Sequence, residues 1–277
     1  MRTARRYRRG VARSRTETAL VTVVGDDGIR RRPDELIVEE PMSIQLDGTL
    51  VTTTMRTPGN DFELAVGFCL TEGLLAGAVV TAVRYCATGP AIDTDFNVVT
   101  VDTDGRGPMP AAGLGTTTSS CALCGNDAID ALCDRLAPLP ATPMPMLSRL
   151  RSIPGLVRER QRLFESTGSV HAAAAFTDDG EVLVVREDVG RRNAVDKVIG
   201  SLHLEQRLPA SGLGLFVSGR ANFELVQKAW AGGFRSLVAV SAPTALAVEA
   251  ARRAGLVLAG FVRDDRLNVY APERLPS

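Results

Sequence analysis

The sequence predicts a mixed α/β protein, with an antiparallel β layer near the N-terminus and a parallel sheet near the C-terminus. The first observation is a series of short β-rich segments before residue 60, two of them joined by Asp47-Gly48, a dipeptide typical of hairpin turns. The second is the alternation of apolar strands and amphipathic helices after residue 212, which implies parallel strands with right-handed crossovers. We therefore expect two subdomains of different sheet type.

The composition excludes several classes of protein. The chain has 277 residues, 45% of them apolar and 23% charged, which is ordinary for a soluble globular protein. Its net charge is zero, so charge gives no reason to expect a nucleic-acid partner. No apolar run approaches the roughly 20 residues of a membrane span. Five cysteines, an odd number, suit a reducing cytoplasm better than a disulfide framework.

The chain divides into four parts. Residues 1–17 are predicted to be a disordered basic tail, because residues 1–15 hold seven arginines and no acid, with no apolar segment after them that would make an export signal. The other parts are a β-rich subdomain (18–115), a segment with a C-x-x-C loop, a helix and a Pro-rich linker (116–146), and an α/β subdomain (147–277).

The β-rich subdomain is predicted from alternating apolar residues and turn signals. Strands are expected at residues 20–24, 35–39, 42–46, 50–55, 80–85 and 96–101. A helix is expected to begin at Asn60 or Asp61 and to end near Gly73. Its inward face would consist of Phe62, Ala65, Val66, Cys69 and Leu70.

Cys121 and Cys124 form a C-x-x-C motif that is predicted to be the reactive centre. It follows a Gly/Pro-rich approach at 102–115 and precedes a helix that Asn126 or Asp127 can cap. A helix N-terminus and the hydroxyls of residues 116–120 would both favour thiolate over thiol. The pair is therefore expected to be exposed and activated.

The spacing of the cysteines leaves several interpretations open. The bland one is two cysteines near a turn without chemistry. A structural zinc site needs four ligands and here there is one pair, while a deaminase-type zinc site needs an H-x-E sequence that the chain lacks. A thioredoxin-like enzyme would carry the motif near its first strand. We therefore expect a thiol that carries a group, no zinc, and buried inert thiols at Cys69 and Cys133.

Beyond the linker, the sequence predicts a helix capped by Ser152 and ended by Gly168, and then a hairpin of strands 170–176 and 181–186. His171 opens this hairpin and is a candidate ligand-binding residue, although a lone histidine is more often structural. After Gly190 a further helix is expected, and Arg191 and Asn193 at its start could meet an anion. Asp196 and Lys197 are expected to pair on the surface.

The last part of the chain predicts strands at 213–217, 236–240 and 256–262, with helices at 222–231 and 244–254. Ligands of open parallel sheets bind beyond the carboxyl ends of the strands. The candidate residues at those ends are Ser218, Gly219, Arg220, Ser241, Thr244, Gly260, Phe261, Val262, Arg263, Asp264, Asp265 and Arg266. The small residues would admit a phosphate and the arginines would grip it, whereas Walker A and dinucleotide motifs are absent.

Together these stretches resemble the FdhD family of formate dehydrogenase accessory proteins, over nearly the whole chain after residue 17. The matching stretches are Arg56–Asp61, Leu70–Gly73, Ser119–Cys121, Cys124-Gly125, Gly168–His171, Asp188–Arg191, Asn193-Ala194, Asp196-Lys197, Ser218–Arg220, Ser241–Thr244, Gly260-Phe261 and Arg263. Two positions depart from the family pattern. Ala122 stands where the family usually has Gly, and Arg192 stands where it usually has His.

The resemblance implies a fold similar to the cytidine deaminases, a three-layer α/β/α arrangement, without their zinc. It implies a dimeric sulfur carrier that takes persulfide sulfur from a cysteine desulfurase to the molybdenum cofactor before that cofactor enters formate dehydrogenase. Cys121 would bear the persulfide, Cys124 would assist its release, and the strand-end residues would hold the guanine dinucleotide parts of the cofactor, with GDP as a surrogate ligand. The rival hypotheses are a thiol–disulfide oxidoreductase and a cofactor chaperone with incidental cysteines.

Overall fold

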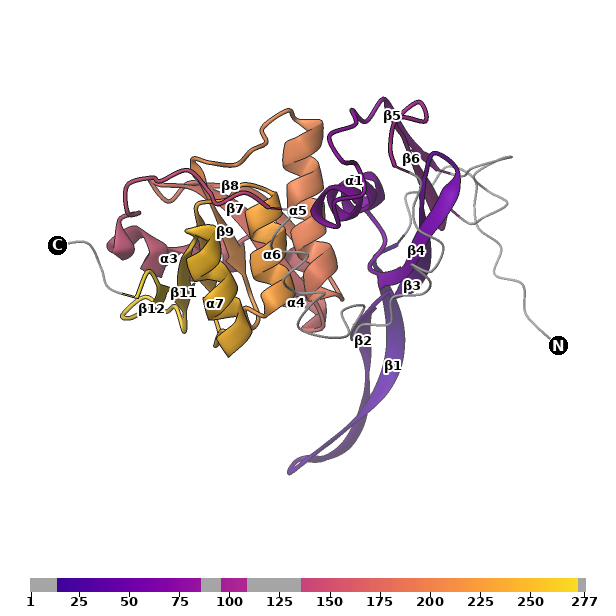
Figure 1. Cartoon of the computed structure of the whole chain (residues 1–277). Helices are drawn as coiled ribbons and strands as arrows, with labels where there is room; N and C mark the ends of the chain where they lie inside the picture. Colours follow the sequence, from indigo (N-terminus) through magenta and orange to yellow (C-terminus); the bar gives the residue numbers. More distant parts are fainter. Residues whose placement is uncertain (1–13, 86–95, 109–135, 274–277) are drawn as a thin grey trace.

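The computed structural model describes residues 14–85, 96–108 and 136–273, and Figure 1 shows its elements in chain order. The first two strands, β1 (Thr16–Gly25) and β2 (Gly28–Ile37), form an antiparallel hairpin that projects from the body as an arm. The sequence predicted only the centre of β1 and the end of β2. The part of β2 that was missed holds Arg30, Arg31, Arg32 and Pro33, because such residues mask a strand pattern.

The N-terminal subdomain is built on a four-stranded sheet. Its strands are β3 (Glu40–Leu46), β4 (Thr49–Arg56), β5 (Ala82–Tyr85) and β6 (Val98–Asp102), in the order β4-β3-β6-β5. The hairpin at Asp47-Gly48 is confirmed, with positive φ at both residues. The expectation of a purely antiparallel layer is wrong, because β3 pairs with β6 in parallel. A long connection through helix α1 allows the chain to enter β6 in the same direction as β3.

Helix α1 (Asp61–Thr71) covers this sheet and confirms the predicted helix. Asn60 precedes it in a left-handed conformation without a side-chain capping bond. Ala65, Val66 and Cys69 are fully buried in the core with Met42, Ile44, Val99 and Val101. Phe62 and Leu70 are partly buried at the edge of the same core. The helix therefore presents the predicted face to the sheet.

Two helices open the C-terminal subdomain where one was predicted. They are α3 (Leu147–Arg158) and α4 (Arg162–Thr167). Ser152 lies inside α3 and donates to the carbonyl of Arg149, so the expectation that it caps a helix is wrong. Pro154 is tolerated within α3, and Gly168 ends α4 at a positive φ as predicted.

The second sheet has six strands in the order β12-β11-β10-β9-β7-β8. Its elements are β7 (His171–Thr177), β8 (Val182–Asp188), α5 (Arg191–Leu204), β9 (Leu213–Val217), α6 (Phe223–Ala231), β10 (Ser236–Ala239), α7 (Ala245–Ala254), β11 (Val257–Gly260) and β12 (Asn268–Ala271). The predicted parallel β-α-β-α-β unit is confirmed in β9, β10 and β11. The sequence missed β12, a short antiparallel strand at the sheet edge. Since β8 and β9 both pair antiparallel with β7, they are also parallel to each other.

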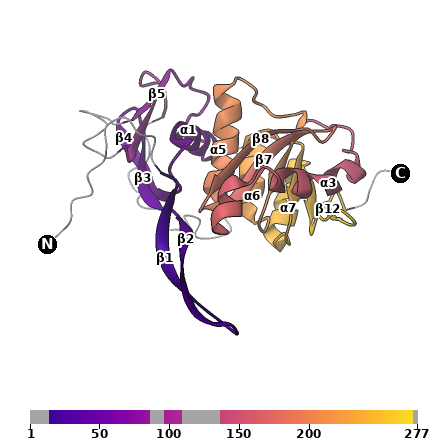
Figure 2. The same ribbon diagram turned by 180° about the vertical axis from the view of Figure 1, so that it is seen from behind.

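Helices cover both faces of this sheet. Helices α5, α6 and α7 pack on one face, where Val195, Leu225 and Leu237 belong to one apolar cluster. Helix α3 packs on the other face, where Ile153 and Phe216 belong to a second cluster. Figure 2 shows the sheet from behind, with α3 in front of it. The sheet is thus buried on both sides, as parallel strands require.

The two subdomains meet where α1 crosses α5 (Figure 1). The crossing depends on two buried glycines. A Cβ at Gly67 would lie 1.9 Å from the carbonyl oxygen of Asp196, and one at Gly200 would lie 1.8 Å from that of Glu63. No side chain fits at either position, so the helix backbones touch directly.

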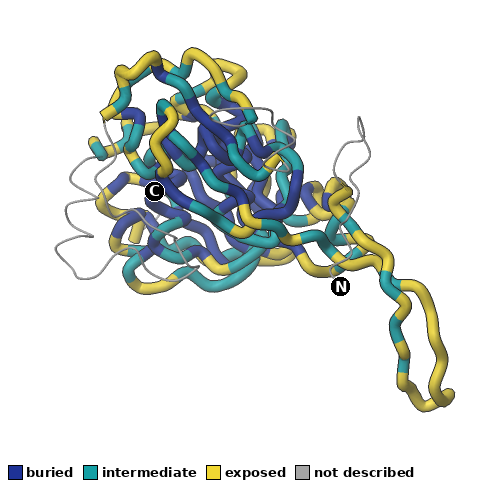
Figure 3. The backbone as a smooth tube through the Cα atoms, turned by 90° about the vertical axis from the view of Figure 1, so that its right-hand side faces the viewer, coloured by how far each residue is buried: buried dark blue, intermediate teal, exposed yellow. Residues whose placement is uncertain are grey.

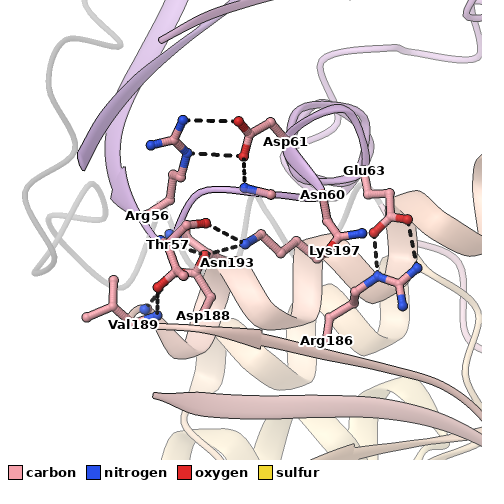
Figure 4. A network of polar contacts seen from close by, with 12 residues as sticks. Arg56, Thr57, Asn60, Asp61, Glu63, Arg186, Asp188, Val189, Asn193 and Lys197 are labelled. Carbon is pink, nitrogen blue, oxygen red and sulfur yellow. Dashed lines mark hydrogen bonds and ion pairs between the residues drawn. The ribbon is translucent and has the colours of Figure 1, made fainter. Parts of the chain in front are cut away.

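A buried polar network joins the same two subdomains (Figure 4). Lys197 Nζ donates to Asp188 Oδ2 at 2.6 Å and to the carbonyl of Thr57 at 2.9 Å. Asp188 also accepts bonds from the backbone N–H groups of Thr57 and Gly190. Burial lowers the pKa of Lys197, and Asp188 opposes that shift. The predicted surface pair of Asp196 with Lys197 is therefore wrong, because each of them pairs in the interior with a different residue.

Asp196 belongs to a second buried cluster at this junction. It pairs with Lys228 Nζ at 3.0 Å, and Lys228 also donates to Glu72 Oε1 at 2.8 Å. Burial lowers the pKa of Lys228, but the charges of Asp196 and Glu72 outweigh it and raise the pKa overall. Because Glu72 follows α1 while Lys228 lies on α6, this cluster fixes a second point of contact between the subdomains.

The glycine crossing predicts a stability change. Gly200→Ala should lower the free energy of unfolding by about 1–3 kcal/mol, since the added methyl group forces the helices apart. Gly212→Ala is the matched control, because no atom lies within 4 Å of the Cβ it would add. Urea denaturation followed by circular dichroism measures both. Equal unfolding midpoints for the two variants would contradict the close crossing.

Candidate functional site

The candidate ligand-binding residues converge on one edge of the six-stranded sheet. The parallel strands β8, β9, β10 and β11 all end at this edge. His171, at the start of β7, pairs with Asp188 at the end of β8 and so lies at the same edge. Residues 191–193, 218–220 and 241–244 follow the ends of β8, β9 and β10, and residues 260–266 begin with the last residue of β11. Segments far apart in sequence thus form one surface.

Backbone hydrogen bonds join neighbouring loops along this edge. Ala221 N donates to the carbonyl of Ala242, and Thr244 N donates to that of Ala221. Phe261 N then donates to the carbonyl of Ser241. The side chains of Asn222 and Thr244 cap α6 and α7. The loops are therefore held in fixed positions relative to each other.

A cavity of about 670 Å³ opens on the α3 side of this edge. Of the predicted residues, His171, Ser218, Arg263 and Asp264 line it. The sequence did not predict the opposite wall, which comes from the ends of α3 and α4 and includes Arg158, Gln161 and Phe164. The Arg158 guanidinium stacks 4.2 Å from the Phe164 ring centroid, so a cation and an aromatic ring both face the cavity.

His171 is the titratable group of this cavity whose pKa shifts. Burial lowers its pKa, the Arg191 charge lowers it further, and Asp188 opposes the shift. The imidazole is therefore neutral at pH 7 and able to accept one hydrogen bond and donate another. A Cβ at Gly219 would lie 3.5 Å from the His171 ring, so the loop after β9 passes close beside it.

The side chain of Arg263 is held by hydrogen bonds to nearby backbone carbonyl groups. Its Nη1 donates to the carbonyls of Val240 at 2.6 Å and Val262 at 2.8 Å. Beside it, Phe261 is 41% exposed at a φ of 51°, a conformation that is rare for a bulky residue and that clusters at ligand sites. An oriented guanidinium and an exposed ring thus stand together after β11.

The remaining predicted residues occupy several environments. Asp265 and Arg266 line a second cavity of about 510 Å³ with Arg151 and Leu267. Val262 is fully buried in the core, so only its backbone can reach a ligand. Neither cavity is lined by Gly219, Arg220, Ser241, Thr244, Gly260, Phe261, Val262, Arg191 or Asn193.

The polar residues at the start of α5 make different contacts. Asn193 is buried and donates to the carbonyl of Met55 and to Asp188, so it serves the subdomain junction. Arg192 pairs with Glu224 at 2.6 Å. Arg191 Nε is buried without a hydrogen-bond partner, and the Arg191 charge acts on His171. Of these three residues, Arg191 is thus the one whose charge lowers the pKa of His171, which lines the cavity.

Comparisons with known proteins agree on one family. The FdhD/NarQ family profile matches residues 37–276. The chain belongs to the FdhD/NarQ family. A relative from Corynebacterium efficiens named sulfur carrier protein FdhD is 47% identical over 256 residues, covering 88% of this chain and 92% of the relative. A relative of the same name from Streptomyces avermitilis is 45% identical over 271 residues, covering 93% of this chain and 94% of the relative.

The fold is also found in a solved structure. A crystal structure from Desulfotalea psychrophila, assigned as a formate dehydrogenase accessory protein, superposes with a TM-score of 0.74 at 23% identity. The superposition covers 95% of this chain and all of the other. The FdhD/NarQ chain therefore shares its mixed α/β fold with that protein.

Four of the five cysteines lie outside the described residues, namely Cys86, Cys121, Cys124 and Cys133. Cys69 is fully buried, as predicted, and burial with the charges of Asp196 and Glu72 raises the pKa of its thiol to about 12. Its thiolate is thus strongly disfavoured. Residues 14–85, 96–108 and 136–273 include no group of three or more potential metal ligands and no helix long and apolar enough to span a membrane.

The electrostatics of the cavity predict an NMR titration. Arg191→Gln should raise the pKa of His171, because a positive charge that disfavours the imidazolium is removed. His203 is an internal control, since it is the only other histidine and burial alone lowers its pKa. The imidazole Cε1–H shifts of both can be followed against pH. An unchanged His171 midpoint, or equal movement of both midpoints, would contradict the assigned influence of Arg191.

Proposed function

We propose that the chain is a sulfur carrier that accepts persulfide sulfur on Cys121 and delivers it to the molybdenum cofactor destined for formate dehydrogenase. The observation that carries the proposal is the 47% identity, over most of both chains, to relatives named sulfur carrier protein FdhD. The C-x-x-C of Cys121 and Cys124 supplies thiols for such a role. Cys69 is unsuited to it, because its thiolate is disfavoured.

Loading exchanges one S–S bond for another. The Cys121 thiolate attacks the outer sulfur of the persulfide on a cysteine desulfurase. The S–S bond of the donor breaks, an S–S bond to Cys121 forms, and the donor cysteine leaves as a thiolate. No net oxidation occurs, so this step requires no oxidant. A thiolate-favouring setting for Cys121 would speed the attack.

Release uses the second cysteine. The Cys124 thiolate attacks the Cys121 sulfur, the two cysteines are oxidised to a disulfide, and the outer sulfur is reduced and leaves as hydrosulfide. The molybdenum cofactor is the substrate that accepts it. A thiol reductant then restores both cysteines for another cycle. The two thiols therefore have different roles, with Cys121 as the carrier and Cys124 as the group that frees the sulfur.

The sheet edge is proposed to bind the guanine nucleotide parts of that substrate. Arg263, Arg158 and neutral His171 offer hydrogen-bond donors along one cavity, and guanidinium groups bind phosphate with two parallel bonds. The exposed ring of Phe261 can stack on a base. We propose GDP as a surrogate ligand, with the loops after β9, β10 and β11 as the rest of the site.

The proposed partners follow from the reaction. A cysteine desulfurase supplies the sulfur and a formate dehydrogenase receives the finished cofactor. The chain is proposed to act in the cytoplasm as a homodimer, without zinc, nucleic acid or a membrane as a partner.

The proposed carrier role predicts the pattern of sulfur loading. A desulfurase with cysteine should add one sulfur atom to the wild type, and a reductant should remove it. Cys121→Ala should abolish the addition because the acceptor thiolate is gone, while Cys124→Ala should load but release less. Cys69→Ala is the control and should load normally, since that thiol is buried. Intact-protein mass measures all four proteins.

Two outcomes would contradict this assignment. Restoration of formate dehydrogenase activity by Cys121→Ala, in a strain lacking the chain, would remove Cys121 as the carrier. A reversible disulfide without any sulfur loading would favour the oxidoreductase instead.

The proposed nucleotide site predicts a loss of GDP binding. Arg263→Ala should weaken GDP binding by about tenfold or more, because a hydrogen bond to a charged group is worth roughly 1.5–3 kcal/mol. Arg252→Ala is the matched control, since Arg252 is exposed in the last turn of α7, away from the helix end that faces the site. Isothermal calorimetry measures both. Persulfide loading on Cys121 should survive either change, and unchanged GDP affinity in Arg263→Ala would remove Arg263 from the site.

A further inference from the structure

The arm formed by β1 and β2 is a two-stranded sheet with no third strand among the described residues. Figure 3 shows it standing away from the body with exposed residues along most of its length. Leu20, Val24 and Ile29 are 57%, 75% and 76% exposed. An isolated hairpin is marginally stable in water, and exposed apolar strands invite pairing with another chain. The arm thus has the features of an interaction element.

The outer edge of β2 is protected against such pairing. Pro33 lies opposite Leu20 in the β1–β2 register. Because proline has no N–H group, Leu20 and Pro33 form a non-hydrogen-bonded pair, and the proline ring lies on the outer edge of β2. Arg30, Arg31 and Arg32 precede it. Charged residues and proline are the usual means by which proteins block edge strands.

The outer edge of β1 lacks that protection. Hydrogen-bonded and non-hydrogen-bonded pairs alternate along the hairpin. Like Leu20, the β1 residues Thr18, Thr22 and Val24 therefore stand in non-hydrogen-bonded pairs with β2. Their backbone N–H and C=O groups therefore point outward. From Thr18 to Val24 the strand contains no charge, no proline and no glycine, and most of its residues are β-branched. This edge is suited to β-strand addition.

The outer edge of β1 is suited to pairing with β1 of a second copy of this chain. In an antiparallel β1–β1 pair with a two-fold axis at Val21, Leu20 lies opposite Thr22 of the second copy and Thr18 lies opposite Val24. Only apolar and threonine side chains then meet, and Glu17 lies opposite Gly25. Pairing through β2 would instead set arginines against arginines, and like charges in direct opposition are destabilising.

We infer that two copies of this chain associate through β1, in a four-stranded sheet of order β2-β1-β1-β2. Each copy covers the unprotected edge of the other, and only the proline- and arginine-bearing edges of β2 stay outermost. Symmetric use of one surface by both copies closes the assembly at a dimer. The inference rests on the homodimer included in the proposed function, but it is independent of the sulfur chemistry.

Two proline variants of the full chain, at two residues that face each other in the hairpin, test the proposed β1–β1 interface. Thr22 and Arg31 face each other in the hairpin, and both direct their N–H groups outward, but on opposite edges. Thr22→Pro should raise the dimer dissociation constant by about tenfold or more, since the symmetric dimer loses two ladder donors. Arg31→Pro introduces the same residue at the same height of the arm and should leave the constant unchanged. Sedimentation equilibrium measures both.

Amide hydrogen exchange on the wild type keeps the test independent of how well the variants fold. The N–H groups of Thr18, Leu20 and Thr22 should become protected as protein concentration rises, while those of Ile29, Arg31 and Glu35 exchange rapidly. A wild type that stays monomeric would overturn both the homodimer and this surface. A dimer in which the outward amides of β1 exchange as rapidly as those of β2, or which Thr22→Pro leaves intact, would overturn the surface alone.

Discussion

The buried carboxylate of Asp188 is the group on which the rest of the arrangement depends. Its two oxygens accept bonds from Lys197, Asn193 and the backbone N–H groups of Thr57 and Gly190. One side chain at the end of β8 thereby fixes the start of α5 and the segment after β4 in the other subdomain. A buried charge with this many partners is costly to disturb, since removal of one partner leaves an uncompensated ion in the interior. The junction is therefore specific in geometry, and the glycine crossing of α1 and α5 keeps it closely packed.

The same carboxylate connects the junction to the sheet edge. Asp188 lies opposite His171 in the β7–β8 register, and its charge opposes the lowering of the His171 pKa that burial and Arg191 cause. Asn193 and Arg191 lie two residues apart on α5, yet one bonds into the junction and the other influences the cavity. Val189, which lines the cavity just before α5, donates its N–H to Thr57 Oγ1, so this part of the wall is set by a contact with the N-terminal subdomain.

Local sequence patterns predicted most strands and helices of the six-stranded sheet. The features that they did not predict depend on contacts between residues far apart in the sequence. Strand-end residues such as Ser218 and Arg263 could be placed on one edge because parallel strands with helical crossovers leave no other arrangement. The wall formed by Arg158 and Phe164 was missed, since nothing in a helix pattern says which sheet edge its end will reach. Lys197 was misjudged for the same reason: a lysine next to an aspartate suggests a surface pair, and only the fold brings Asp188 and Thr57 to it. Charged residues and Pro33 hid most of β2, because an exposed arm has no buried face to give an alternating pattern.

The junction also fixes the relative position of the two described stretches that border residues 109–135. Residues 96–108, which include β6, lie in the N-terminal subdomain, and residues 136–139 lie against the C-terminal one. There Trp230 Nε1 donates to the carbonyl of Ala137 at 2.7 Å, and Leu139 N donates to that of Ala254 at 2.9 Å. Residue 108 therefore belongs to one subdomain and residue 136 to the other, and their relative position is set by the Asp188 network and by Lys228 with Glu72 and Asp196. Buried ion pairs add little net stability compared with apolar contacts, but they favour one relative position of the parts they join. For the proposed sulfur carrier, a fixed relative position of the two subdomains gives a physical reason for charged residues in a junction that apolar side chains could also have filled.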